Sequence, residues 1–334
     1  MHPSVVSVHA QPWEQAWHDA LYGPAGFYRR SAPAAHFATS VQGVPGGGRL
    51  LAQALVALAR RHGCTRLVDV GCGRGELLRH VRTLAPDLRL TGVEVVAAPP
   101  DLDVDDWLVA PGGGALPDGL TDLEDALVLA HEWLDVVPCP VAVRDDDGVW
   151  RTLAVGASGR EEDGGLLAGD ELRWASRWLG PEVVRAEIGR PRDLALSHLA
   201  GRVRSGVVLA VDYGHTLADR PRHGTLSGFR GGREVAPLPD GSCDLTAHVA
   251  VDSLVDEGNL CTKVRERHLL LQREALLDLL PDPPPVTPVE HELARRDATA
   301  YLEALARRST LATLTARGGL GDFWWVMALV GPDA

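Results

Sequence analysis

The chain has 334 residues, of which 45% are hydrophobic, so it can bury a sizeable core in one large, elaborated domain or in two domains. Its 33 Lys and Arg residues against 45 Asp and Glu residues give a net charge of −12, which argues against nucleic acid as a partner and favours a cationic protein or peptide. Five cysteines without a Cys-x-x-Cys pair, and the lack of a leader-like segment or a bilayer-length apolar run, lead us to expect a cytoplasmic protein without structural zinc or membrane contact.

The first part of the chain alternates helical and strand patterns after an N-terminal helical segment. Spacing of apolar residues and the positions of Gly and Pro set the boundaries. In chain order we predict a helix over 13–22, a loop over 23–48, a helix over 49–61, a strand over 66–71, a helix over 75–85, a strand over 88–94, loop over most of 96–122, and a buried strand over 126–130.

The second part continues the alternation and ends on a strand. In chain order we predict a hairpin over 141–155, a helix over 171–179 capped by Asp170, a helix over 192–204, a strand over 207–212, turns over 220–242, helices over 245–257 and 268–280, a proline-rich linker over 281–285, helices over 290–308 and 310–317, and a strand over 324–330. Strands that alternate with helices favour an α/β fold with a mainly parallel sheet.

The most informative motif runs from Leu67 to Leu78 (LVDVGCGRGELL). An apolar strand opens into a glycine-rich turn that leads directly into a helix, as in the first unit of an open α/β sheet, where ligands bind at the carboxyl ends of the strands. Glu94 ends the next strand, 94 − 75 = 19 residues after Gly75, where a carboxylate can bind both hydroxyls of a ribose. The alternative is a plain tight turn in a unit that binds nothing.

The glycine spacing distinguishes between nucleoside cofactors. A dinucleotide fingerprint has a third glycine where this chain has Glu76, and a carboxylate there would repel a pyrophosphate. S-adenosyl-L-methionine (SAM) has no phosphate, and needs close backbone approach and an acid for its ribose. The motif therefore favours SAM as the cofactor.

The segment from His131 to Pro138 follows the strand 126–130 and places Glu132 and Asp135 at the ligand edge, where they can hold an amine or guanidinium. The alternative is a capping turn with solvated acids. A zinc-protease signature fits poorly, because Asp135 stands in place of the second histidine and Pro138 ends the helix too early, so we expect no metal.

A further candidate, Asp212-Tyr213-Gly214-His215, follows the strand 207–212. Asp212 and Tyr213 are candidates for the substrate cleft, although Asp212 can equally be a strand-end acid next to a Gly214 turn. His215 and His248 are possible proton acceptors, but lone histidines are more often structural. The sequence contains no nucleophile elbow and no P-loop pattern.

Together these segments resemble the MidA-like SAM-dependent methyltransferases, a family that includes a mitochondrial complex I assembly factor that methylates an arginine. The likeness covers about residues 17 to 250 and is carried by an ordered set of motifs: Ala20 to Tyr28, His36 to Ser40, Val68 to Leu78, His131 to Pro138, Asp212 to Gly214, Gly224 to Leu226, and Asp244 to Val249. His131 and His36 differ from the asparagine and aspartate that the family usually has at these positions.

The resemblance implies a class I SAM methyltransferase fold, Rossmann-like, with an N-terminal helical segment and lid over 1–62 and a methyltransferase core over 63–334 that carries insertions at about 139–180 and 219–318. It implies that residues 20–40 fold over the cofactor. It assigns SAM binding to Asp69, Gly71, Gly73, Gly75, Glu94 and His131, and the acceptor side of the reaction to Glu132, Asp135 and Asp212.

Three functions follow as alternatives. The first is methylation of an arginine in a protein substrate, possible targets being subunits of a respiratory or other multisubunit complex. The second is methylation of a small molecule by SAM. The third is a SAM-binding assembly factor with little turnover, which the replacement at His131 keeps open.

Overall fold

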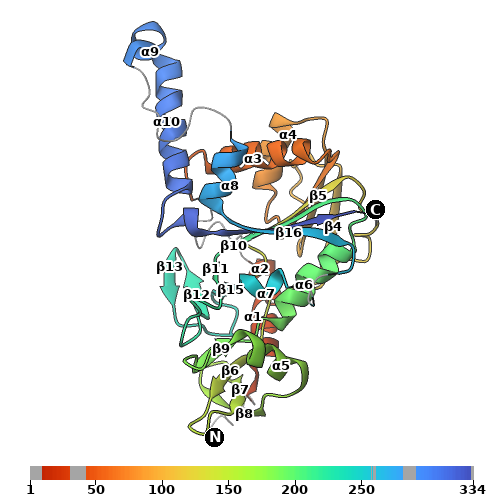
Figure 1. The fold of residues 1–334 in the computed structure, drawn as a ribbon, viewed down its shortest axis with the longest axis vertical. Helices are drawn as coiled ribbons and strands as arrows, with labels where there is room; N and C mark the ends of the chain where they lie inside the picture. Colours follow the sequence, from red (N-terminus) through yellow and green to blue (C-terminus); the bar gives the residue numbers. More distant parts are fainter. Residues whose placement is uncertain (1–9, 31–42, 257, 259–260, 281–290, 332–334) are drawn as a thin grey trace, which may run out of the picture.

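The computed structural model describes residues 10–30, 43–256, 258, 261–280 and 291–331. A central sheet has helices on both faces and a smaller β-rich lobe below it in the view of Figure 1. The motif at 36–40 and the proline-rich linker at 281–285 lie outside the described residues.

The central sheet has seven strands in the order β16-β17-β10-β5-β2-β3-β4. The five from β10 to β4 are mutually parallel, whereas β17 is antiparallel to both of its neighbours, β10 and β16. This confirms the prediction of an α/β fold with a mainly parallel sheet. The strands are β2 (Arg66–Val70), β3 (Arg89–Glu94), β4 (Asp106–Val109), β5 (Ala126–His131), β10 (Gly206–Asp212), β16 (Val264–Leu271) and β17 (Trp324–Val330).

The strands are apolar on both faces because helices cover both. On β5, Leu127 and Leu129 pack with α3 (Gly47–Arg61), α4 (Glu76–Leu84) and α8 (Gln272–Leu279). The alternate residues Val128 and Ala130 face the opposite layer, which contains α6 (Arg190–Gly201) and α7 (Val251–Leu254). Figure 1 shows these helices on opposite sides of the sheet. Burial on both faces explains the continuous apolar runs of the parallel strands.

The small lobe, which comprises β1, β6 to β9 and α5, is a mostly antiparallel sheet with one helix. Its core contains Trp150, Trp174 and Val183. The N-terminal helix lies between this lobe and the central sheet (Figure 1), and the Trp17 indole donates to the Leu245 carbonyl at 3.0 Å. The elements are β1 (Gln11–Pro12), α1 (Trp13–Tyr22), α2 (Phe27–Arg30), β6 (Val141–Arg144), β7 (Trp150–Val155), β8 (Glu161–Leu166), α5 (Gly169–Trp178) and β9 (Arg185–Glu187).

The remaining elements are short strands beside the sheet and a helical extension. The short strands are β11 (Gly214–His215), β12 (Ser227–Arg230), β13 (Arg233–Val235), β14 (Asp244–Thr246) and β15 (Val249–Ala250). The extension consists of α9 (His291–Arg296) and α10 (Ala298–Leu314), which project away from the body in Figure 1, and the 3₁₀ helix η2 (Leu320–Asp322) follows it. The domain boundaries predicted above stay a prediction.

Several predicted elements are wrong in type or extent. The helix predicted over 245–257 is two short strands, β14 and β15, followed by the single turn α7. Most of the first half of the helix predicted over 268–280 belongs to β16, because this segment pairs with β17 along the sheet. The loop over 96–122 contains the edge strand β4. Asp170 lies inside α5, whose N-cap is Ala168.

Candidate functional site

A pocket of about 980 Å³, its open mouth included, lies at the carboxyl ends of β2, β3 and β5. Its place is the crevice where open parallel sheets bind ligands. The lining combines the glycine-rich turn, the ends of the strands, the loop after β4 and two tyrosines of the N-terminal segment. It consists of Tyr22, Tyr28 and residues 69–73, 76–77, 93–95, 110, 112–113, 115–116, 131–133 and 136.

The glycine-rich turn passes close beneath this pocket with backbone angles that favour glycine. Gly71, Gly73 and Gly75 have φ values of 73°, 58° and 76°. A Cβ atom on Gly71 would lie 3.0 Å from Cδ1 of Trp133, and one on Gly75 would lie 2.6 Å from a methyl carbon of Leu102. The turn can therefore pack against its neighbours only because these positions lack side chains.

Glu94 lies at the end of β3 and is held by backbone amides. Its two carboxylate oxygens accept hydrogen bonds from Gly73 N at 2.9 Å and from Val95 N at 2.6 Å. Burial raises the pKa of Glu94, and these amides oppose the rise. The side chain thus connects the end of β3 to the glycine-rich turn while facing the pocket, the position expected for an acid that binds a ribose.

Asp69 and Glu76 add two more carboxylates to the pocket lining. Asp69 is 3% exposed, and burial raises its pKa to about 8, with the charges of Glu94 and Glu76 acting in the same direction. Glu76 accepts a hydrogen bond from Arg74 N at 3.1 Å. Among the described residues that line the pocket there is no Lys or Arg. This set suits hydroxyl donors and a cation, and it does not suit a pyrophosphate.

An apolar part of the lining supplies a surface for a flat ring. Val93, Val95, Ala110 and Leu116 contribute it, and Ala110 N donates to the Glu94 carbonyl at 2.8 Å. The residues present therefore fit SAM, with acids for the ribose and the cationic end and an apolar wall for the adenine. Ala110 and Leu116 carry no sequence signal for a binding site, because 96–122 reads as a proline-rich loop.

Directly after β5, the turn at His131 and Glu132 forms one side of the pocket. His131 is buried, which lowers its pKa to about 4 and keeps the imidazole neutral near pH 7. Its Nδ1 lies 3.7 Å from a Glu132 carboxylate oxygen. Glu132 has φ of 50°, a strained angle for a residue with a side chain, and its amide donates to Val211 O at 2.8 Å. Such strain is typical of functional sites.

Asp212 lies behind the pocket wall and holds the same turn in place. Its carboxylate accepts from Leu134 N at 3.0 Å, Asp135 N at 3.1 Å and Tyr213 N at 3.0 Å. Asp135 in turn accepts from the Tyr213 hydroxyl at 2.5 Å. Neither aspartate lines the pocket. The structure thus brings Glu132 to the pocket and places the other two candidates behind it, where they can position the wall.

The N-terminal segment closes the opposite side of the pocket. The Tyr22 hydroxyl donates to Val136 O at 3.0 Å, and the Tyr28 hydroxyl donates to Asp244 Oδ1 at 2.7 Å. Arg29 Nε donates to Tyr22 O at 2.9 Å. Residues 20–30 therefore contribute to the pocket wall. The rest of the predicted lid, 31–40, lies outside the described residues.

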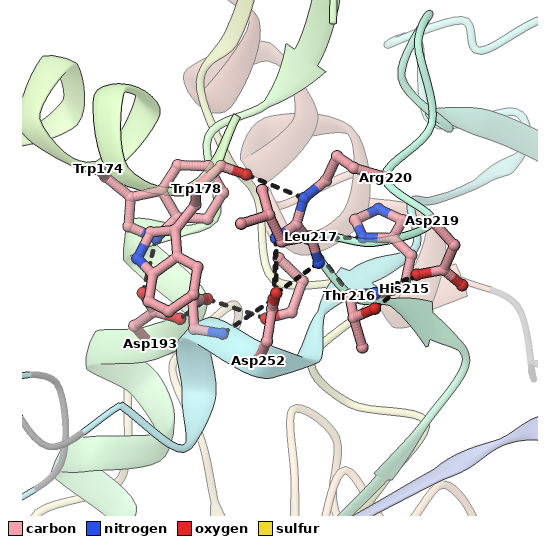
Figure 2. A network of polar contacts seen from close by, with 11 residues as sticks. Trp174, Trp178, Asp193, His215, Thr216, Leu217, Asp219, Arg220 and Asp252 are labelled. Carbon is pink, nitrogen blue, oxygen red and sulfur yellow. Dashed lines mark hydrogen bonds and ion pairs between the residues drawn. The ribbon is translucent and has the colours of Figure 1, made fainter. Parts of the chain in front are cut away.

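His215 and His248 lie elsewhere. Figure 2 shows Arg220 between His215 and Asp252, in a network that joins the loop after β11 to α7. Arg220 donates to His215 Nδ1 at 2.7 Å, so the proton of the ring is on Nε2. Burial and then the Arg220 charge lower the His215 pKa to about 3. Neither histidine lines the pocket, and the structure gives His215 a structural place.

The described part of the chain contains no group of three or more His, Cys, Asp or Glu residues arranged to hold a metal ion. None of its helices has the length and apolar character needed to cross a membrane.

Comparison with known proteins identifies similar chains. Residues 107–266 match the model of a family described as "Putative S-adenosyl-L-methionine-dependent methyltransferase". A crystal structure from Burkholderia thailandensis bound to S-adenosyl-homocysteine is 18% identical, with 97% of this chain and 89% of that chain covered and a TM-score of 0.74. A native structure from the same organism is 19% identical, covers 97% and 88%, and has a TM-score of 0.70. No curated protein matches the chain.

Proposed function

We propose that this chain, a SAM-dependent methyltransferase with a class I fold that is similar to the MidA-like family, methylates an arginine side chain of a protein. The observation that supports the choice of acceptor is the pocket itself. Its lining carries four carboxyl groups, those of Asp69, Glu76, Glu94 and Glu132, and no Lys or Arg among the described residues. A cationic acceptor head suits such a site, and the net charge of −12 suits a cationic protein surface.

SAM would be held by Glu94 at its ribose and by the backbone of the glycine-rich turn, and it supplies an electrophilic methyl group on a sulfonium. Asp69, His131 and Gly75 complete our proposed cofactor set. Ordering the acceptor against that methyl group can account for about 7–11 kcal/mol of the barrier. We assign this ordering to Glu132, because its strained backbone directs it to the pocket from the end of β5.

Glu132 also has an electrostatic role in this proposal. A guanidinium has a pKa above about 12, so its free base is scarce near pH 7. A carboxylate next to it orients the reacting nitrogen and stabilises the positive charge that stays on the group after methyl transfer and proton loss. Asp212 acts through the position of the turn that carries Glu132, and Asp135 lies on that turn, on the acceptor side. The neutral His131 imidazole offers one donor and one acceptor nitrogen beside it.

We also propose that residues 20–40 form the cover of the site and that the chain is organised as a segment over 1–62 and a core over 63–334. Tyr22 and Tyr28 support the first part, since both line the pocket and are anchored by their hydroxyl groups.

The test is an incubation of the purified protein with methyl-labelled SAM and an extract of its native cells, followed by mass spectrometry. We expect label in methylarginine of one or a few proteins, and none with Glu132→Ala, although that variant still binds SAM in calorimetry. Label that appears only in metabolites would establish the small-molecule alternative. Tight SAM binding without any transfer would favour an assembly factor.

A further inference from the structure

Two buried carboxylate oxygens behind the pocket lack a hydrogen-bond partner. They are Oδ1 of Asp135 and Oδ2 of Asp244, on side chains from residues that are 4% and 0% exposed. No other carboxylate oxygen among the described residues is both this buried and without a partner. Buried polar atoms nearly always have partners, so two such exceptions require an explanation.

The two aspartates lie on adjoining segments. Asp135 is on the turn after β5 and Asp244 begins β14, and Ala247 N donates to the Asp135 carbonyl at 3.1 Å. Arg192, which is 1% exposed, binds the carbonyls of both Asp135 and Ala247, at 2.8 Å and 3.1 Å. The two carboxylates interact electrostatically: burial raises the pKa of Asp244, and the negative charge of Asp135 raises it further.

Each carboxylate is fixed through one oxygen by a tyrosine, which leaves the other oxygen available. Tyr213 binds Oδ2 of Asp135 at 2.5 Å, and Tyr28 binds Oδ1 of Asp244 at 2.7 Å. Tyr28 lines the pocket, as does Val136, which follows Asp135 in the chain. The pair therefore lies next to the pocket wall, on the side formed by the N-terminal segment.

The chemistry of the pair suits a planar cation. The buried cation at hand, Arg192, donates to the carbonyls of Asp135, Val137, Ala247 and His248. These hydrogen bonds all go to backbone carbonyls, so Arg192 acts on Asp135 through its charge and not through a hydrogen bond to either of the two carboxylate oxygens. A guanidinium presents several N–H donors in one plane and can bind two carboxylate oxygens at once, which an ammonium group does less well.

We propose that Asp244 determines acceptor specificity, with its Oδ2 and Oδ1 of Asp135 together binding the guanidinium of the acceptor arginine. This inference rests on the proposed arginine methylation and adds the residue that recognises the arginine. Because Tyr28 lines the pocket and binds Asp244, the acceptor reaches the pair by displacing the Tyr28 side chain. Asp244 is a binding residue here, and the transferred methyl group does not pass through it.

Asp244→Asn tests the proposal, because the amide keeps an oxygen that can accept from Tyr28 and removes the charge. Asp193→Asn is the matched control. Asp193 is also buried, but its two oxygens are bonded to Trp174 and Ser253 in the network of Figure 2, away from the pocket. The probe is Nα-acetyl-arginine methylamide, and its uncharged analogue Nα-acetyl-citrulline methylamide is the ligand control. Binding is measured by ligand-observed NMR with and without S-adenosyl-homocysteine.

We expect the wild type and Asp193→Asn to bind the arginine compound at least about tenfold better than the citrulline compound, and Asp244→Asn to lose that preference, as a charge-assisted hydrogen bond implies. SAM affinity should stay within about twofold in both variants, since Glu94 and the glycine-rich turn are unchanged. If Asp244→Asn does not fold, Asp135→Asn removes the other half of the pair and keeps an acceptor for Tyr213.

The outcomes separate this inference from the proposed function. The inference alone is overturned if Asp244→Asn keeps the same preference for the arginine compound as the wild type. It is also overturned if the wild type does not bind the arginine compound while extracts still acquire methylarginine. In both cases a buried water is the partner of the pair. Binding that depends on Asp244, without methylarginine in extracts, supports a guanidinium site at Asp244 but overturns arginine methylation as the use of that site.

Discussion

At the scale of single residues, Glu94 connects the cofactor site to the local backbone. Its oxygens accept from Gly73 N and Val95 N, so the same carboxylate that faces the pocket also fixes the turn beneath it. Removing the side chain therefore weakens ligand binding in two ways, by losing a ribose partner and by loosening the turn.

Glu94→Ala should weaken SAM binding by about 10- to 150-fold, which corresponds to the roughly 1.5–3 kcal/mol of a charge-assisted hydrogen bond. Isothermal titration calorimetry measures this directly. Asp106→Ala is the control, because Asp106 lies at the other end of the neighbouring strand β4 and pairs with Arg89 at the surface. Unchanged affinity in Glu94→Ala would remove Glu94 from the site.

Gly71→Val should abolish detectable SAM binding. The substitution forces a β-branched residue to adopt a φ of 73°, which is unfavourable for valine. Its Cβ would lie 3.0 Å from Trp133 Cδ1, so the turn must shift. Gly63→Val is a matched control, since Gly63 has φ of 66° but no atom within 4 Å of the added Cβ. Both variants should lose about 1–3 kcal/mol from backbone strain, but only Gly71→Val should lose the ligand. Retained binding would place the cofactor away from this turn.

At the scale of elements, the sequence predicted the parts of the sheet that are buried on both faces. The apolar runs of β2, β3, β5 and β10 fit no other element of their length. β4 and β16 lie at the two edges of the sheet. β4 has only four residues (DWLV) within a proline-rich segment, and β16 carries three charged residues near its start, so neither segment was predicted as a strand. β16 contains Arg, Glu and Leu residues common in helices, and pairing with β17 determines its conformation.

The same contrast between buried central strands and other segments decides which residues of the candidate site could be predicted. Asp69, Gly71, Gly73, Glu94, His131 and Glu132 all line the pocket, because they lie at or directly after the ends of strands that were predicted correctly, whereas Gly75 does not line it. Tyr28 lies on the short helix α2 and Ala110 directly follows β4, neither of which was predicted, and their position depends on tertiary contacts such as the Tyr28 bond to Asp244. No local pattern gives the partner of such a residue.

Arg192 is the best test of how elements hold the site together, because it joins the turn after β5 to the segment after β14. Arg192→Met should lower the free energy of unfolding by about 3 kcal/mol or more, since it leaves buried carbonyls without donors. Urea denaturation measures this. Arg190→Met on the same helix is the control and should cost at most about 1 kcal/mol, because Arg190 forms only a surface pair with Asp170. Equal losses would mean that Arg192 does not join these segments.

At the scale of the whole molecule, the buried acids make stability depend on pH. Burial raises the pKa of Asp69 to about 8 and of Asp193 and Asp244 to about 7. Between the unfolded pKa near 4 and these values the folded state holds a proton that the unfolded state has lost, so stability falls as pH rises. His131 and His215 have lowered pKa values of about 4 and 3, and their opposite effect ends near pH 6.5.

We therefore expect the free energy of unfolding of the ligand-free protein to fall by about 2–4 kcal/mol between pH 6.5 and 8.5. Thermal and urea denaturation at several pH values check this, at constant ionic strength. Asp193→Asn should flatten part of the slope, because one of the three groups then no longer titrates. Stability that is constant or rises over this interval would contradict the high pKa values.

The position of β17 has a consequence for how the chain folds as it is made. Residues 324–330 form the strand between β10 and β16, although both of those are translated earlier. Until this stretch leaves the ribosome tunnel, β10 and β16 each expose an unpaired edge, and such edges attract other chains. A nascent chain of this protein is thus a natural client for holdase chaperones, and a stop codon before residue 324 should yield aggregates instead of a shortened enzyme.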